Sequence, residues 1–232
     1  MIDWHSHVLP LIDDGSQSVQ ESCSMLSLMK AQGVTHVIAT PHFYANDESV
    51  DEFLGRRDAS YELLMKNIDS AACPQIICGA EVRYYPGIAK MKELDLLTIA
   101  GTKLLLLEMP MSKWTEYAIN ELIDLTNIRG FTVVLAHIER YLPLQSRDII
   151  PRLVDCGILI QSNASFFEGF VDRHRALYLL NAGLIHFIGS DCHNLTTRAP
   201  NIDLAYDLIL KKRGQDYLSQ MIEFGYDALG YR

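Results

Sequence analysis

Histidines and carboxylates recur along this chain in pairs separated by one residue. The first run is Asp3-Trp4-His5-Ser6-His7, and Asp191 and His193 repeat the spacing near the other end. Because side chains on a β-strand alternate between its two faces, residues two apart point the same way, and two such side chains can reach one metal ion. Either pair alone is a weak signal, since polar strand ends also satisfy ordinary hydrogen bonds.

Further residues of the same types follow at intervals, each at or just past the end of a short apolar run. The complete set of candidate metal ligands is His5, His7, Asp14, His42, Glu81, Glu108, His137, Asp191 and His193, and Asn163 is a further polar residue at a run end. Imidazole nitrogen and carboxylate oxygen without thiolate favour Mn, Fe, Zn or Mg over a cysteine-rich structural zinc site. Nine candidate ligands exceed one coordination sphere, so more than one ion is expected.

The apolar runs predict strands of a parallel sheet that is buried on both faces. They cover residues 2–7, 35–40, 75–81, 103–108, 131–137, 158–163 and 185–191. Helical patterns lie between them at residues 18–32, 51–71, 116–129, 148–156 and 172–181. This alternation predicts an α/β fold, either a parallel barrel or an open doubly wound sheet. In both folds the carboxyl ends of the strands form one face, so the candidate ligands should converge there.

Composition bounds the remaining possibilities. The chain has 232 residues, of which 49% are hydrophobic, and it shows no linker or repeat, so residues 1–232 are expected to form a single domain. A formal charge of -9 disfavours nucleic acid as a partner. We find no signal peptide and no apolar run long enough to span a bilayer, which predicts a cytoplasmic protein without membrane insertion. An odd number of cysteines without a CxxC motif argues against a disulfide framework.

Cys192 and Arg198 have the C-x5-R spacing of cysteine-dependent tyrosine phosphatases, which use a thiolate nucleophile. The five residues between them include no glycine, although a phosphate cradle of backbone N–H groups usually needs one. Cys192 also lies between two expected metal ligands and should point away from them on an extended segment. We therefore interpret the spacing as accidental. The three remaining histidines, His36, His174 and His186, are interpreted as structural or surface residues.

The ordered motifs IDWHSHVLPLIDDG, ATPH, GAE, LLEMP, AHIERY and SDCHN resemble those of the PHP superfamily, named for polymerase and histidinol phosphatase. Within it, the chain is similar to the bacterial PHP-type protein tyrosine phosphatases of capsule and exopolysaccharide operons. The resemblance runs from residue 1 to about residue 200. It implies the PHP fold, a distorted (β/α)7 barrel related to the TIM barrel, and a trinuclear metal centre.

The resemblance also implies roles for individual residues. The first ion would be held by His5, His7, Glu81 and Asp191, the second by the bridging Glu81 with Glu108 and His137, and the third by Asp14, His42 and His193. Glu108 and Asp14 favour the tyrosine phosphatase branch, because histidine is common at both places elsewhere in the superfamily. Arg140 and Arg198 would be the catalytic pair that grips the substrate phosphate, although arginines at loop positions also form surface salt bridges.

By the same resemblance, the substrate is phosphotyrosine in the tail of a membrane-associated bacterial tyrosine kinase that governs polysaccharide export. Tyr84, Tyr85 and the pair Phe43-Tyr44 follow strand ends and either flank a phenyl ring or serve packing. The main alternative is a PHP phosphatase for a small phosphomonoester such as histidinol phosphate. A rival of another class is a binding or scaffolding protein with a degenerate metal centre. A homo-oligomer is compatible with the sequence but is not indicated by it.

Overall fold

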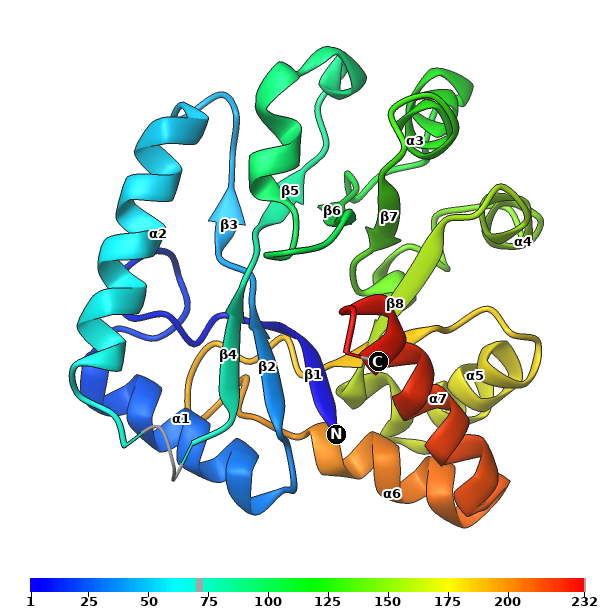
Figure 1. The fold of residues 1–232 in the computed structure, drawn as a ribbon. Coiled ribbons are helices and arrows are strands. Elements are labelled where there is room, and N and C mark those ends of the chain that lie inside the picture. The colour runs from blue at the N-terminus through cyan, green and yellow to red at the C-terminus, as the bar shows by residue number, and fades with distance from the viewer. Residues whose placement is uncertain (70–72, 232) are drawn as a thin grey trace.

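Parallel strands alternate with helices throughout the computed structural model, which describes residues 1–69 and 73–231 (Figure 1). The strands are β1 (Ile2–Ser6), β2 (His36–Ala39), β3 (His42–Phe43), β4 (Gln75–Cys78), β5 (Glu81–Arg83), β6 (Leu104–Glu108), β7 (Thr132–Leu135), β8 (Leu159–Asn163) and β9 (Phe187–Gly189). The helices are α1 (Val19–Ala31), α2 (Val50–Met65), α3 (Glu116–Asn127), α4 (Ile149–Asp155), α5 (Phe170–Asn181), α6 (Ile202–Arg213) and α7 (Gln215–Ala228).

Two of the strand positions are broken in the middle. The strands pair in two sheets, β1-β2-β4 and β3-β5-β6-β7-β8-β9, and every pair is parallel. Backbone hydrogen bonds from Gly79 to Ala39 (2.8 Å) and from Glu81 to Pro41 (3.0 Å) continue the ladder across the breaks. Thus β2 and β3 are two halves of one strand position, as are β4 and β5, so the strands of the described residues fill seven positions.

The first and last strands meet, which closes the sheet. Ser6 and Cys192 form a parallel bridge, and the His7 backbone N–H donates to the carbonyl of Cys192 at 2.9 Å. The Asp191 N–H donates to the carbonyl of His5 at 2.7 Å. The fold is therefore a distorted barrel rather than an open doubly wound sheet, which confirms the predicted fold class.

Apolar side chains form two layers, one inside the barrel and one between the strands and the surrounding helices. Inside, the Trp4 and Phe187 rings stack with centroids 3.8 Å apart. The last helix, α7, covers this inner layer, and its Gly225 lies against Ile2 and Trp4. Polar side chains are thereby left to the opposite end of the barrel, where the strands finish.

Several helix starts have simple causes in the sequence. The Ser18 side chain accepts a hydrogen bond from the Glu21 N–H and caps α1, while Ser49 and Glu52 form a complete capping box at α2. The helix predicted over residues 51–71 ends earlier, at Met65, and residues 70 and 71 lie outside the described residues.

In the part of the chain that the structure describes, no helix has both the length and the apolar character needed to cross a bilayer.

Candidate metal centre

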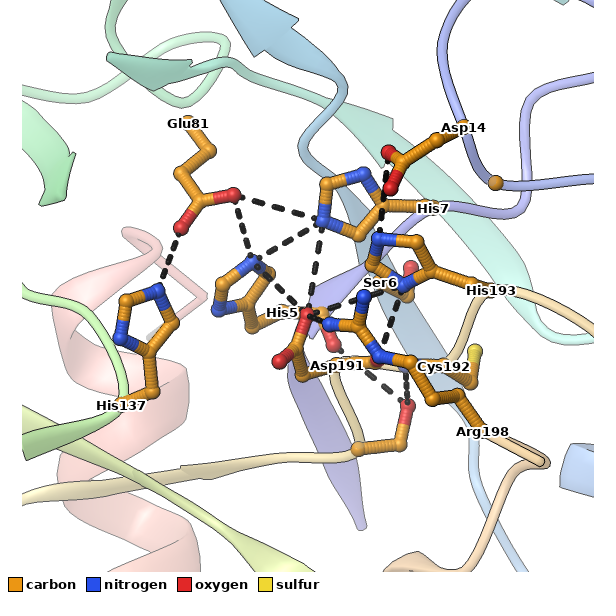
Figure 2. A network of polar contacts seen from close by, with 12 residues as sticks. His5, Ser6, His7, Asp14, Glu81, His137, Asp191, Cys192, His193 and Arg198 are labelled. Carbon is orange, nitrogen blue, oxygen red and sulfur yellow. Dashed lines mark hydrogen bonds and ion pairs between the residues drawn. The ribbon is translucent and has the colours of Figure 1, made fainter. Parts of the chain in front are cut away.

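The nine candidate ligands come together at the carboxyl ends of the strands, and Figure 2 shows most of them converging. His5 lies on β1, Glu81 begins β5 and Glu108 ends β6. His42 begins β3 after the break at Pro41, and Asp14 lies in the loop between β1 and α1. The others lie just beyond strand ends, namely His7, His137, Asp191 and His193. Of the nine, the side chains of His42, Glu108 and Asp14 are the more exposed, and Asp14 is 67% exposed.

Three groups of these side chains each bring one ligand atom per residue within 4.8 Å of the others. The groups are His5, His7 and Glu81; His7, Asp14, His42 and His193; and His42, Glu81 and Glu108. In the first group the His5 and His7 Nε2 atoms are 3.2 Å apart, and Glu81 Oε2 lies 3.3 Å and 3.4 Å from them. Both imidazoles thus direct a nitrogen to the same point.

The remaining two candidates border these groups. His137 Nε2 lies 2.8 Å from Glu81 Oε1 and 3.6 Å from Glu108 Oε1. Asp191 Oδ1 lies 3.6 Å from the Nε2 atoms of both His5 and His7. Glu81 therefore lies at the centre of the cluster, in contact with histidines on two sides.

Backbone strain is concentrated at this site. Among the described residues, the non-glycine residues with positive φ are Leu11 (62°), His137 (33°) and Asp191 (52°). Such angles are unfavourable for residues with a Cβ and persist where the surroundings impose them, commonly at functional sites. Two of these three residues are candidate ligands, so the fold holds them in place at a cost in local stability.

Two positioning residues were missed by the sequence analysis. Asp13 Oδ2 accepts a hydrogen bond from His7 Nδ1 at 2.7 Å, which leaves His7 Nε2 directed at the cluster. Gln161 Oε1 accepts from the His137 backbone N–H at 2.6 Å and lies 3.3 Å from His5 Nδ1. Carboxylates and amides in these places orient ligating imidazoles and select their tautomer. Asp13 stands beside Asp14 in the DDG motif, and Gln161 is the first of three consecutive polar residues in β8.

Charge coupling within the cluster is strong. Burial alone would lower the pKa of His7, but Asp13 and Glu81 raise it to about 10. Burial, together with the neighbouring His7, lowers the pKa of His193 to about 4. Burial would raise the pKa of Glu81, yet the adjacent histidines, His5 foremost, hold it well below its usual range. A cation bound here would compete with the proton on His7, because metal ligation requires a free imidazole nitrogen.

The donor set fits divalent metal ions. His5, His7 and His137 are fully buried, and in the described chain the buried His193 Nε2 has no hydrogen-bond partner. Buried nitrogen lone pairs without donors are costly, whereas a coordinated cation satisfies several of them together. Mixed nitrogen and oxygen donors are suited to Mn, Fe, Zn or Mg.

Arg140 and Arg198 lie beside the cluster and reach the same carboxylate. Arg198 Nη2 lies 2.6 Å from Asp191 Oδ1, and Arg140 pairs with the other oxygen of Asp191. Both side chains are about one third exposed, at 34% and 36%. Two guanidinium groups at the mouth of the cluster form an anion-binding edge that solvent and ligands can reach.

Cys192 is fully buried in the apolar core, and burial raises the pKa of its thiol well above the usual range. A thiolate nucleophile needs the opposite environment, partly exposed and electropositive.

The three histidines interpreted as structural or surface residues lie outside the described ligand groups. His36 packs on Tyr226, and His174 is exposed on α5. His186 accepts a hydrogen bond from the Ile160 N–H at 3.1 Å.

The predicted aromatic positions divide into a buried pair and a half-buried pair. Phe43 is fully buried, and Tyr84 is largely buried and donates to Glu121 at 2.8 Å. Tyr44 and Tyr85 line a cleft of about 450 Å³. The Tyr44 ring stacks on His42 with centroids 5.3 Å apart, so this cleft borders the cluster.

A closed parallel α/β barrel whose strand ends gather imidazoles and carboxylates defines a metal-binding barrel of the PHP type. The family profile for capsular polysaccharide synthesis, CpsB/CapC, matches residues 1–225, and the chain belongs to that family. The resemblance stated from the motifs is thereby confirmed.

Individual relatives cover nearly the whole chain. It is 32% identical to tyrosine-protein phosphatase CpsB of Streptococcus pneumoniae over 231 residues, 92% of this chain and 91% of that protein. It is 30% identical to tyrosine-protein phosphatase YwqE of Bacillus subtilis (strain 168) over 221 residues, 93% of this chain and 86% of that protein. A solved structure from the work on YwqE of B. subtilis and CpsB of S. pneumoniae, described as unique metal-dependent tyrosine phosphatases, superposes with a TM-score of 0.85 and 27% identity, covering 100% of this chain and 95% of the other.

Proposed function

We propose that the chain is a metal-dependent phosphatase that hydrolyses phosphotyrosine in proteins. The observation that carries the proposal is the cluster itself, in which His5, His7 and Glu81 direct ligand atoms to one point and two arginines lie alongside. The tyrosine phosphatase relatives, similar over more than nine tenths of the chain, support the same activity.

The proposed centre holds three divalent ions, with Mn expected and Fe, Zn or Mg as alternatives. The ligands would be His5, His7, Glu81 and Asp191 for one ion, Glu81, Glu108 and His137 for the second, and Asp14, His42 and His193 for the third. Three overlapping groups of described residues support metal binding by these sets, and the central position of Glu81, which lies 2.8 Å from His137 Nε2, suits a bridging role.

Bound divalent ions supply a water of lowered pKa and stabilise negative charge on the transferred phosphoryl group. Four ligand carboxylates contribute -4 and three such ions +6, so the pocket would attract a phosphate dianion although the chain carries a charge of -9. Arg140 and Arg198 would exchange part of their pairing with Asp191 for the phosphate oxygens, and would orient the ester for in-line attack. No covalent enzyme intermediate is required.

The proposed substrate is phosphotyrosine in the tail of a membrane-associated bacterial tyrosine kinase, and the proposed compartment is the cytoplasm. Membership of a capsular polysaccharide synthesis family supports a role in capsule or exopolysaccharide production. Arg140 and Arg198 are partly exposed at the edge of the metal centre, where a phosphorylated side chain presented by a protein can reach them.

Phosphate release from a phosphotyrosine peptide and from histidinol phosphate tests the proposal. We expect turnover of the peptide, its loss in EDTA, its recovery with Mn²⁺ and its survival in Cys192→Ser. Elemental analysis should find three divalent ions for each active chain. Turnover of histidinol phosphate alone would contradict the substrate class, and turnover of neither compound would favour a binding protein. Activity that survives EDTA but is lost in Cys192→Ser would contradict the mechanism.

A further inference from the structure

One arginine in the cleft beside the metal centre, Arg83, has a place that the proposed chemistry leaves unused. Arg83 ends β5, two residues after Glu81, so the two side chains leave the strand on the same face and Arg83 lies one step, roughly 7 Å, further out. It also lies directly opposite Glu108 in the parallel pairing of β5 and β6. Arg83 therefore stands next to the proposed ligands, at the rim.

Two linked ring contacts hold the Arg83 guanidinium in the cleft. It lies over the Tyr44 ring, 5.5 Å from the centroid, and that ring stacks on His42. Arg83 also forms a side-chain hydrogen bond with Tyr44, and because a guanidinium has five N–H donors, others remain to bind an anion. The cation is thus held in a defined position relative to the metal centre.

Arg83 differs from the other two arginines of the site in its ion pairing. Within residues 1–69 and 73–231 it takes part in no ion pair, although Asp47 lines the same cleft and Glu108 is its neighbour across the sheet. The side chain is exposed, in a chain with a formal charge of -9. Arg140 and Arg198, by contrast, both pair with Asp191.

We propose that Arg83, held by Tyr44, forms an anion-binding subsite for a carboxylate or a second phosphate that the substrate protein carries beside its phosphotyrosine. The subsite rests on the proposed phosphotyrosine phosphatase function and adds a specificity determinant to it. The cleft of about 450 Å³ has room for one side chain. In an extended peptide, side chains two residues apart lie on the same side about 7 Å apart, which matches the step from Glu81 to Arg83.

Three versions of one phosphotyrosine peptide test the subsite: one flanked by glutamates, one flanked by glutamines, and one with a neighbouring second phosphotyrosine. For the wild-type protein we expect kcat/KM to be about fivefold higher for an anionic neighbour than for glutamine, with the advantage shrinking as salt rises. The glutamate and the doubly phosphorylated peptides distinguish the two sources of the anion. Arg83→Gln should reduce the advantage to less than twofold, and Arg83→Lys should retain part of it.

Arg173→Gln is the matched control, because Arg173 is an exposed arginine on α5, away from the cleft, and this variant should keep the full preference. A wild-type protein without preference, or an Arg83→Gln variant that keeps it, would overturn the subsite alone. Equal losses on all three peptides with fewer bound metal ions would also overturn it, since Arg83 would then support the metal centre. Failure to cleave any phosphotyrosine peptide would remove the proposed function and the subsite together.

Discussion

Asp13 provides a sensitive test of how the metal centre is organised. Its carboxylate accepts hydrogen bonds from His7 Nδ1 (2.7 Å) and from the backbone N–H groups of Gly15 (2.9 Å) and His42 (3.0 Å). In Asp13→Asn one oxygen becomes an amide nitrogen, which can only donate. If that nitrogen faces His7 Nδ1, the His7 proton moves to Nε2, the atom that points at Glu81. If it faces Gly15 instead, two donors oppose each other.

The magnitude follows from what is lost. A hydrogen bond to a charged group contributes about 1.5–3 kcal/mol, and residues that orient metal ligands typically change metal affinity by about 10- to 100-fold. We therefore expect Asp13→Asn to raise the Mn²⁺ concentration for half-maximal activity by about 10- to 100-fold. At saturating Mn²⁺, kcat should fall by less than about tenfold, because Asp13 acts through His7 and not on the substrate.

Titration of metal-free protein with Mn²⁺, followed by phosphatase activity and by calorimetry, measures both quantities. Asp207→Asn serves as the control, because Asp207 is an exposed carboxylate on α6, and its titration should match the wild type. Unchanged metal affinity in Asp13→Asn would refute the positioning role. A loss of kcat that saturating metal does not restore, with normal affinity, would instead indicate a direct part for Asp13 in the reaction.

Two further predictions concern stability. An added Cβ at Gly189 would lie 2.5 Å from His5 Cβ and 2.8 Å from His5 N. Gly189→Ala should therefore lower the free energy of unfolding, measured in urea, by about 1–3 kcal/mol. Gly55 lies at an open position in helix α2, so Gly55→Ala should raise that free energy by about 0.5–1 kcal/mol. Burial lowers the pKa of His186 to about 4, so between pH 6.5 and 4 the unfolded chain binds the extra proton and stability falls as pH decreases. In EDTA, the loss between pH 7 and pH 5 should be about 2 kcal/mol greater for the wild type than for His186→Gln, and equal losses would contradict this assignment.

Much of the candidate site could be predicted because it depends on strand ends. A residue at the end of a buried parallel strand has its place decided by local pattern and by the common direction of the strands, so Glu108 and His137 were identified from sequence. Asp13 had no such signal, because an acidic residue in a loop has no period and its partner is known only when the loop is folded. Gln161 was missed because it lies inside the predicted strand, before its end at Asn163, and only strand ends were searched for polar residues.

The fold was predicted less completely where contacts are distant in sequence. The choice between barrel and open sheet depended on the pairing of Ser6 with Cys192, which no local pattern reveals. The run over residues 75–81 was interpreted as one strand but forms β4 and β5 in different sheets. Strand β3 and helices α6 and α7 were not predicted. Both helices nevertheless carry a readable apolar period, at Ile202, Ala205 and Ile209 in α6 and at Leu218, Met221 and Ile222 in α7, so the local pattern was sufficient to predict them.

The two strand breaks explain how neighbouring ligands converge. Pro41 lacks an N–H group and interrupts the position shared by β2 and β3. Gly79 lies between β4 and β5, where an added Cβ would lie 3.2 Å from Ile99. One residue after Pro41 comes His42, and two after Gly79 comes Glu81; these two residues pair across β3 and β5 with Nδ1 and Oε2 3.0 Å apart. Because each break restarts the strand at a ligand, both side chains are redirected into the barrel mouth. The breaks that distort the barrel therefore lie directly before two of the proposed ligands, which pair with each other across the sheet.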